Sequence, residues 1–417
     1  MQMEVNKVMI RKNRVSITSL TLMTVLLVVC ANTTKAKEIT IPSQPAQPTT
    51  QNTSEEKSTM VTTETSTSTE TTVTSQSADK HEYERAVAYD EDVSEFETDG
   101  ASTFWNKKKT AYYDSDEKVT GWNVIDGKLY YFDKKGKLFT GVGVQKIGKK
   151  YYCFCDEHYA LYGVHYADDK AYYFAKKGGA RYEKEGVSKL NGHYYCVQKD
   201  ASLKSGWYRN DKGKRYYFDK ESYEALKDWN YIGKFKYFFN SKGQLVQDVR
   251  KKLTKTQKKE YFIRVNRTAS CVTVYAKDGD NGFTIPVVAF ICSAGKETPK
   301  GSFTIKDKLR WHELMGPCWG QWCMHLTTDI LFHSVYYDKE RDKKSLNVGA
   351  YNKLGTMASH GCVRLRAGDC KWIYDNCDVG TKVEIYNNKK NPGPFDKPTI
   401  KKLSSGHTWD PTDPTIK

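Results

Sequence analysis

The chain carries, at residues 359–365, the heptapeptide Ser359-His360-Gly361-Cys362-Val363-Arg364-Leu365. A free thiol has a pKa near ~8.5, so at neutral pH it needs a nearby base or a positive setting before it can attack a carbonyl. A glycine directly before the cysteine lets a carbonyl group approach the backbone closely, and amides around such a cysteine can form an oxyanion hole. The heptapeptide therefore predicts a nucleophile site.

Two further segments precede the heptapeptide. Leu331-Phe332-His333-Ser334 ends an apolar run with a His-Ser pair, and Thr298-Pro299-Lys300-Gly301-Ser302-Phe303 lies before it. These three elements, in this order, resemble the catalytic domain of the L,D-transpeptidases (the YkuD family). That family combines a TPxGxF element, a His-Ser or His-Gly pair, and S-H-G-C followed by an apolar residue and Arg or Asn. The resemblance covers about residues 262–387.

The chain departs from the family pattern in one spacing. The 28 residues between His333 and Cys362 exceed the usual interval. Residues 337–344 are strongly polar, and we interpret them as a loop insertion that lengthens this interval.

The resemblance implies a role for each matching residue. Cys362 would be the nucleophile, His333 the base that accepts its proton, and Ser334 the group that orients the histidine ring. His360 and Gly361 would line the acyl pocket, with the amide of Gly361 facing the developing oxyanion. The residues expected to contact substrate are Arg364, Ser359 and Trp311.

Structural alternatives stay open for several of these residues. Arg364 alternatively forms a structural salt bridge, and His360 alternatively only supports the loop. Cys318, Cys323 and His325 lie close together, but a zinc site needs a second matching pair of ligands, and none follows. We therefore predict neither a metal nor a cofactor.

The activity implied by the resemblance is peptidoglycan cross-linking by acyl transfer. The thiolate would attack the carbonyl of the third residue of a tetrapeptide stem, and D-Ala would leave. The resulting thioester would pass to the side-chain amine of a second stem and give a 3→3 cross-link. If water is the acceptor, the same site is an L,D-carboxypeptidase. Two rival interpretations are a wall-binding protein without activity and a secreted cysteine peptidase.

An aromatic triplet recurs between residues 121 and 248 at intervals of 21, 21, 22, 22 and 21 residues. A period this regular predicts a solenoid of β-hairpins rather than one globular core. Alternation along a strand places the first and third triplet residues on one face and the middle residue on the other. The six copies begin at Tyr130, Tyr151, Tyr172, Tyr194, Tyr216 and Tyr237.

The first repeat, Gly121-Trp122 followed by Tyr130-Tyr131-Phe132-Asp133, resembles the GW/YYFD unit of choline-binding and related cell-wall-binding modules. In that family, rings from adjacent hairpins surround a quaternary ammonium group. Three units here carry Gly-Val in place of Gly-Trp, so most cages would be incomplete. The resemblance implies that the module binds choline or another wall polymer; alternatively, its aromatics only stack into the spine. The ring residues concerned are Trp122, Tyr131, Trp207, Tyr217 and Trp229.

The N-terminal segment has the layout of an export signal, because basic residues precede an apolar run at 15–31. This run is short for a membrane span, so a cleaved signal and a retained anchor both stay open for residues 1–36. Residues 37–100 are rich in Thr, Ser and acidic side chains, which predicts a disordered spacer. We expect a secreted or wall-associated protein.

The net positive charge agrees with a location at the cell wall, and the cysteine content raises the question of disulfides. Lys plus Arg number 66 against 50 for Asp plus Glu, and no nucleic-acid motif is present, so an acidic wall polymer is the favoured surrounding. Eleven cysteines less Cys362 and Cys30 leave nine, an odd number that cannot pair completely. Cys292 and Cys377 are plausible partners.

The predicted fold class is mostly β. Beyond residue 250, short β-branched and aromatic runs alternate with turns, and only residues 367–376 have a helical pattern. We therefore predict a hairpin solenoid at 101–249, a β-rich L,D-transpeptidase-like domain with a short helix at 250–391, and a loosely held tail at 392–417.

Overall fold

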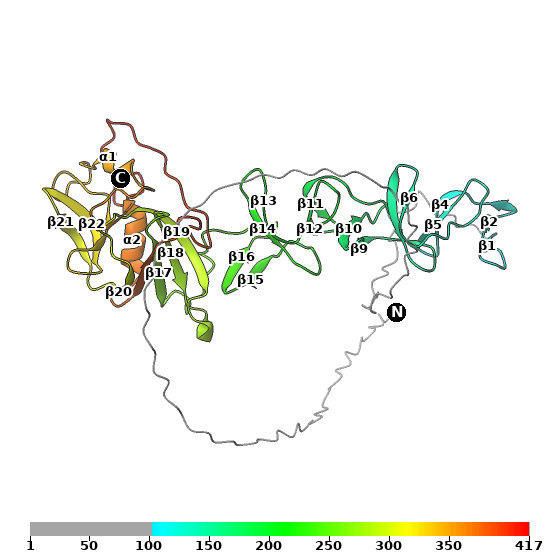
Figure 1. Cartoon of the computed structure of the whole chain (residues 1–417), viewed down its shortest axis with the longest axis horizontal. Coiled ribbons are helices and arrows are strands. Elements are labelled where there is room, and N and C mark those ends of the chain that lie inside the picture. Colours follow the sequence, from blue (N-terminus) through cyan, green and yellow to red (C-terminus); the bar gives the residue numbers. More distant parts are fainter. Residues whose placement is uncertain (1–101, 417) are drawn as a thin grey trace, which may run out of the picture. The chain divides into compact units, whose positions relative to one another are not determined.

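The computed structural model describes residues 102–416 (Figure 1). The predicted export segment at 1–36 and spacer at 37–100 lie outside the described residues. Within 102–416, none of the helices combines the length and the apolar character that crossing a membrane requires. The described chain is mostly β, as predicted.

Six antiparallel hairpins coincide with the six predicted repeats. The first turns at Asp126-Gly127, where both residues have positive φ (50° and 69°), as a two-residue type I′ turn requires. A short three-stranded sheet, β1 (Thr103–Trp105), β2 (Tyr112–Asp114) and β3 (Glu117–Lys118), precedes the hairpins. The paired strands are β4 (Gly121–Ile125) with β5 (Lys128–Phe132), β6 (Gly143–Ile147) with β7 (Lys150–Phe154), β9 (Gly163–Ala167) with β10 (Lys170–Phe174), β11 (Gly186–Leu190) with β12 (His193–Val197), β13 (Gly206–Arg209) with β14 (Arg215–Phe218), and β15 (Asp228–Ile232) with β16 (Phe235–Phe239); β8 (Ala160–Leu161) bridges β5 and β7.

The predicted alternation within the aromatic triplet is confirmed. Tyr172 and Phe174 pack in one cluster together with Cys153 of the preceding hairpin. The middle residue Tyr173 lies in a different cluster, where it meets Tyr195 of the following hairpin. The repeats therefore have several small cores shared between successive hairpins, which is the solenoid character that the period predicted.

The C-terminal part is one nine-stranded sheet with the order β20-β25-β17-β18-β19-β24-β23-β22-β21. The predicted helix coincides with α2 (Ala367–Asn376), and the β-branched and aromatic runs beyond residue 250 form strands of this sheet. The strands are β17 (Tyr261–Asn266), β18 (Cys271–Ala276), β19 (Ile285–Ser293), β20 (Gly301–Thr304), β21 (Leu309–Leu314), β22 (Cys318–His325), β23 (Leu331–Ser334), β24 (Val363–Leu365) and β25 (Lys382–Tyr386); a 3-10 turn lies at Gly279–Asn281 and α1 at Val348–Tyr351.

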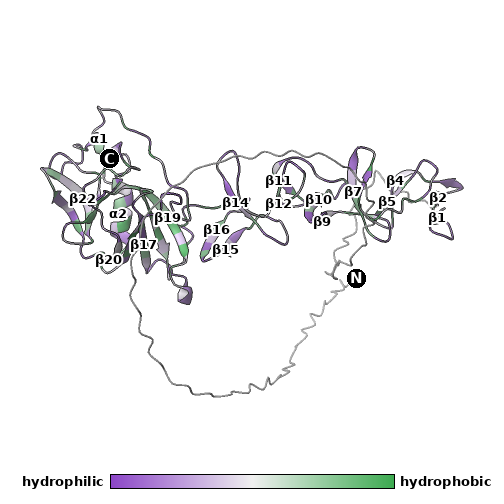
Figure 2. Cartoon of the chain, viewed as in Figure 1, coloured by the Kyte–Doolittle hydropathy of each residue, from purple (hydrophilic) through white to green (hydrophobic). Residues whose placement is uncertain are grey.

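The main core lies between this sheet and α2. All nine residues of β19 are buried, and Figure 2 shows hydrophobic residues along β19 and α2. A second, smaller core gathers around Tyr337, Leu346 and Tyr351. Tyr337 is the first residue of the segment that we interpreted as a polar loop insertion. Tyr337 is nevertheless fully buried and pairs with Trp319, so the start of this segment is packed into the second core.

The tail after residue 392 is held more firmly than we expected. Asp410 accepts a hydrogen bond from the amide of Ala367 (2.7 Å), and Thr412 Oγ1 accepts one from the amide of Gly368 (3.0 Å). These amides open α2, whose first turn would otherwise lack acceptors. The tail thus caps α2, a partnership across about forty residues that local sequence patterns do not reveal.

We predict that Asp410→Ala lowers the free energy of unfolding by about 1–2 kcal/mol, because it removes this capping acceptor. Urea denaturation followed by circular dichroism measures the change. Asp378→Ala is the matched control: its carboxylate is 86% exposed and lies 3.7 Å from Lys308, so its loss should change little. Equal losses in the two variants would contradict the capping role.

Candidate active site

Strand pairing brings the two principal candidate residues together. β23 and β24 are parallel neighbours in which His333 is the partner of Arg364 and Phe332 that of Val363. Cys362 directly precedes β24 and therefore lies beside the start of β23. Its thiol makes a weak hydrogen bond to the carbonyl of Asp329 (3.6 Å) in the turn that leads into β23.

A backbone carbonyl orients the imidazole of His333. Its Nδ1 lies 2.6 Å from the carbonyl oxygen of Ser334, so Nδ1 carries the proton and Nε2 keeps a free lone pair. The hydroxyl of Ser334 is used elsewhere: it donates to the carbonyl of Val335 and accepts from the amide of Gln321. The orienting group is therefore the main chain of Ser334.

Burial keeps the imidazole of His333 and the thiol of Cys362 neutral. His333 is 2% exposed, and burial together with the positive charge of Arg364 and the neighbouring His312 lowers its pKa to about 3. Burial raises the pKa of the Cys362 thiol, although the amide of Leu331 and the charge of Arg364 act in the opposite direction. At neutral pH the site holds a thiol and a neutral imidazole.

Three hydrogen bonds hold the loop that carries Cys362. Ser359 Oγ donates to the carbonyl of Cys362 (2.7 Å), and Thr298 Oγ1 donates to the carbonyl of Gly361 (2.6 Å). Arg364 donates to the carbonyl of Ala358 (3.2 Å). The Thr-Pro element in the sequence thus braces the nucleophile loop, a role that sequence reasoning left unassigned.

Two glycines allow close packing here. A Cβ on Gly361 would lie 2.5 Å from Ile330 Cδ1, so this glycine makes room for a protein side chain. From the sequence we expected Gly361 to make room for a substrate carbonyl instead. A Cβ on Gly320 would lie 3.1 Å from the Cβ of His333, so this glycine lets β22 pass close to the imidazole.

The remaining predicted site residues have different surroundings. Arg364 stacks on Tyr336 (5.1 Å) as well as bracing the loop, and Ser359 is engaged within the loop. His360 is exposed at the surface of the loop. The ring of Trp311 packs against Tyr337 in the second core, 5.3 Å between centroids.

His312 is a neighbour of the site that sequence reasoning missed. It pairs with Gly320 across β21 and β22, and Gly320 in turn adjoins His333. Because side chains alternate along a strand, His312 and Trp311 lie on opposite faces of β21. The ring of His312 is 5.1 Å from the ring of His325. Nδ1 of His325 is in turn 2.8 Å from a carboxylate oxygen of Asp307. Only the strand register reveals this placement.

No group of three or more His, Cys, Asp or Glu side chains in residues 102–416 is arranged to hold a metal ion. The ten cysteines of that range are all free. The suggested pairing of Cys292 with Cys377 is therefore wrong. Both side chains are buried in the main core, where they pack as small hydrophobic groups.

The ring residues of the repeats pack mainly against one another. The rings of Trp122 and Tyr131 are 4.9 Å apart, those of Trp207 and Tyr217 5.4 Å, and those of Trp229 and Phe238 5.2 Å. Cationic side chains of the chain itself cover several ring faces.

Arg181 lies 4.2 Å from the ring centre of Tyr151 and 5.1 Å from that of Tyr172, and Arg215 lies 4.6 Å from that of Trp207. These internal guanidinium groups take positions over the rings that an external cation would need.

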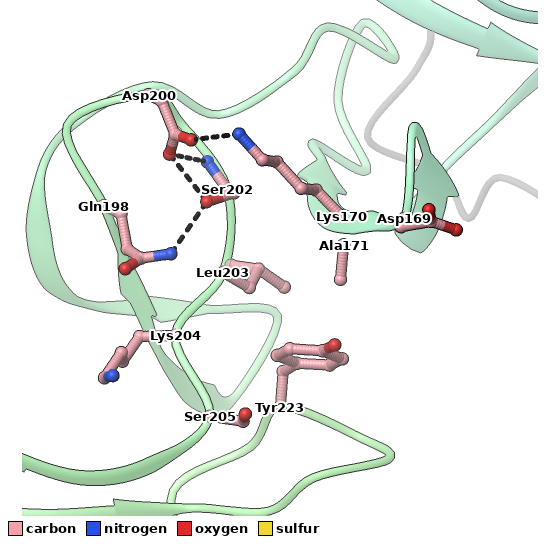
Figure 3. A pocket seen from close by; sticks show the side chains of 10 residues that line it. All are labelled: Asp169, Lys170, Ala171, Gln198, Asp200, Ser202, Leu203, Lys204, Ser205 and Tyr223. Atoms are coloured by element: carbon pink, nitrogen blue, oxygen red, sulfur yellow. Dashed lines mark hydrogen bonds and ion pairs between the residues drawn. The ribbon is translucent and has the colours of Figure 1, made fainter.

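A small cavity of about 240 Å³ lies among the third to fifth hairpins (Figure 3). The figure shows the ring of Tyr223 facing Ala171. Asp200 in its wall pairs with Lys170 (2.9 Å) and accepts from the hydroxyl and amide of Ser202. The polar side chains of Asp200, Lys170 and Ser202 in the wall of this cavity thus already bind one another.

Comparison with known proteins supports the resemblance. Residues 260–385 match the family model of the L,D-transpeptidase catalytic domain, YkuD. The Bacillus subtilis (strain 168) protein YciB, which is provisionally named an L,D-transpeptidase, is 37% identical over 119 residues. The match covers 27% of this chain and 59% of YciB, so this chain spans about three fifths of the length of that relative.

Two solved structures share a limited likeness with the chain. Choline-binding protein F from Streptococcus pneumoniae is 22% identical over 35% of this chain and 51% of its own, with a TM-score of 0.26. An L,D-transpeptidase from Mycobacterium smegmatis is 21% identical over 30% of this chain and 58% of its own, with a TM-score of 0.24. At such scores these likenesses carry no argument.

We predict that alkylation of Cys362 by iodoacetamide accelerates as the pH rises, with a midpoint above the ~8.5 of a free thiol, because burial raises this pKa. Mass spectrometry of the modified peptide follows the rate at each pH. Cys362→Ala shows which adducts arise at the other thiols. A midpoint at or below that of a free thiol would contradict the expected neutral thiol at Cys362.

Proposed function

We propose that this chain is a cysteine-dependent peptidoglycan L,D-transpeptidase that forms 3→3 cross-links. One observation carries the proposal: His333 Nδ1 donates a hydrogen bond to the carbonyl of Ser334. This bond leaves His333 Nε2 as a proton acceptor, and His333 lies on β23 beside β24, the strand that Cys362 precedes. A nucleophile, a base and a third group that orients the base are the requirements for activating a thiol. The match of residues 260–385 to the family model supports the same chemistry.

In the first step, the thiol proton of Cys362 passes to His333 Nε2 as the sulfur attacks the carbonyl of the third stem residue. The C–N bond to D-Ala then breaks, and the leaving amine takes the proton back from His333. A thioester remains on Cys362. In the second step an amine of another stem attacks this thioester, loses a proton through His333, and restores the thiol. One amide bond is thus exchanged for another, and no oxidant or cofactor is consumed.

The neutral resting pair affects the timing of proton transfer. An imidazole whose pKa is about 3 cannot hold the proton of a thiol whose pKa is raised. A stable thiolate–imidazolium pair is therefore not expected before substrate binds. Proton transfer should therefore accompany the attack of the sulfur on the substrate carbonyl.

Two alternatives use the same residues differently. If water is the acceptor, the chain is an L,D-carboxypeptidase. If the thiol does not react, it is a wall-binding protein without activity. The braced loop around Cys362 and the oriented imidazole favour an active site over a silent one.

We predict that the full chain converts tetrapeptide muropeptides into a dimer that lacks one D-Ala, and that Cys362→Ala does not. Mass spectrometry of the products distinguishes the acceptors, since tripeptide without dimer indicates a carboxypeptidase. Absence of both products, together with absence of a thioester on Cys362, would support the silent alternative.

The repeats are proposed to hold the enzyme on an anionic wall polymer. Residues 102–249 contain 28 Lys and Arg against 18 Asp and Glu. Internal guanidinium groups already cover the rings of Tyr151, Tyr172 and Trp207. Both observations favour an anionic ligand over choline, because a quaternary ammonium would compete with these side chains for the ring faces and meet like charge.

We predict that Cys362→Ala, used to prevent covalent capture, sediments with isolated cell walls and is released as salt rises from about 0.05 to 0.5 M, because exposed charges are screened. A choline-substituted resin should not retain it. Retention on that resin with elution by free choline would overturn the preference for an anionic ligand.

A further inference from the structure

A cavity of about 500 Å³ lies where the last two hairpins meet the C-terminal sheet. The two parts are joined directly around it: the amide of Lys236 donates to the carbonyl of Thr284 (2.9 Å), and the ring of Phe235 stacks on Tyr275 at 5.5 Å. The walls combine both parts of the chain, and their residues are Trp207, Arg215, Lys234, Phe235 and Tyr237 from the hairpins and Arg264, Tyr275, Tyr386, Asn388, Asn391, Gly393 and Pro394 from the sheet and the segment after it.

The cavity is lined by cations and hydrogen-bond donors. Arg215, Arg264 and Lys234 contribute to its walls, and no carboxylate does. Two acidic side chains bind the lining arginines. Glu384 accepts from Arg264 through both oxygens (2.7 and 3.1 Å), and Asp396 is shared between Arg215 (3.5 Å) and Arg209. Arg215 also donates to the carbonyl of Pro394 (2.8 Å). Lys234 and these three arginines outnumber the two carboxylates, so the net charge stays positive.

An asparagine-rich loop forms one wall of the cavity. Asn266 holds this loop by donating to the carbonyls of Asn388 and Asn391, 2.8 Å each. Asn391 Oδ1 accepts from the amide of Gly393 (2.9 Å), and Asn388 Oδ1 accepts from the amide of Asn391 (3.0 Å). Both side chains are exposed, and the Nδ2 group of each can donate to a ligand. Residues 389 and 390, between them in the chain, are exposed lysines.

Aromatic rings form the opposite walls. The rings of Trp207 and Tyr237 lie 5.2 Å apart at 81°, and the Tyr275 hydroxyl is buried without a hydrogen-bond partner. Guanidinium groups cover Trp207 at 4.6 Å and Tyr386 at 4.4 Å. Each guanidinium covers one face of its ring, so a sugar would pack against the ring edges and the faces left uncovered. The positive charge of the cavity excludes a cationic ligand.

We infer that this junction cavity is a binding site for an anionic saccharide, that is, a sugar that carries a carboxylate or a phosphate. The Arg and Lys side chains and the asparagine donors would bind the anionic group, and the rings would pack against the sugar. The site is separate from Cys362, and its occupation does not require acyl transfer. A polymer bound here would be held at the point where the repeats join the proposed catalytic sheet.

Isothermal titration of the full-length Cys362→Ala protein tests this inference independently of turnover. N-acetylmuramic acid supplies a sugar carboxylate and glucose 6-phosphate a sugar phosphate; N-acetylglucosamine is the neutral control and inorganic phosphate the sugar-free control. We expect at least one of the two anionic sugars to bind ~10-fold or more tightly than both controls. Preference for the carboxylate would indicate peptidoglycan as the source of the ligand, and preference for the phosphate a phosphate-rich wall polymer.

Asn391→Asp provides the decisive variant, because it keeps the oxygen that accepts from Gly393 and replaces the donor with negative charge. It should weaken binding of the anionic sugar by ~10-fold or more. Asn387→Asp is the matched control: Asn387 is also exposed and on the same loop, but its oxygen accepts from Arg267 (3.0 Å) outside the cavity.

Three outcomes would overturn the inference. One is no binding of either anionic sugar, and another is equal weakening by the two substitutions. The third is binding of inorganic phosphate or N-acetylglucosamine as tight as that of the anionic sugars.

Discussion

The register between the parallel strands β23 and β24 is the constraint on which the candidate active site depends. His333 lies opposite Arg364, so the residue that precedes β24 comes to the start of β23, where the loop around Asp329 receives its thiol. A one-residue slip would turn His333 to the other face of the sheet and separate the two groups. The buried neighbours Phe332 and Val363 fix this register because both are fully enclosed in the main core.

Around this pairing, the surrounding polar groups hold conformation rather than supply charge. The carbonyls of residues 358, 361 and 362 each accept a side-chain hydrogen bond. The loop that carries Cys362 is thus fixed by Ser359 and Arg364 of its own segment and by the distant Thr298. The thiol of Cys362 and the imidazole of His333 are neutral because burial outweighs the nearby positive charge for the thiol, and adds to it for the imidazole. The site is thus organised in advance by packing, which lowers the cost of ordering it when substrate binds.

The repeats and the sheet use their cations in two ways. Within the hairpins, guanidinium groups lie over aromatic rings and take the place of an external cation. At the junction, the cations of both parts line one cavity without a carboxylate. A wall polymer that reaches the proposed catalytic domain would therefore meet positive charge first along the hairpins and then at the junction. This arrangement favours anionic polymers by long-range attraction as well as by contact.

Local patterns predicted much of the fold. The six hairpins followed from a period of 21 or 22 residues, and α2 coincides with residues 367–376 because one helical stretch stands among β-branched runs. The tail was misjudged because its anchors are single polar side chains. Asp410 reaches an amide that lies 43 residues earlier in the chain, and no periodicity marks such a contact.

In the candidate site, too, some properties follow from local motifs and others from contacts between distant segments. Cys362 and His333 stand in short motifs whose residue types indicate thiol and imidazole chemistry, so the sequence by itself determined which groups are the candidates to react. The tertiary structure decided the rest: that Thr298 and Ser359 brace the loop, that Trp311 faces the second core while His312 adjoins the site, and that a cationic cavity lies at the junction. Those properties arise where distant segments meet, and a single sequence records the residues but not their distances.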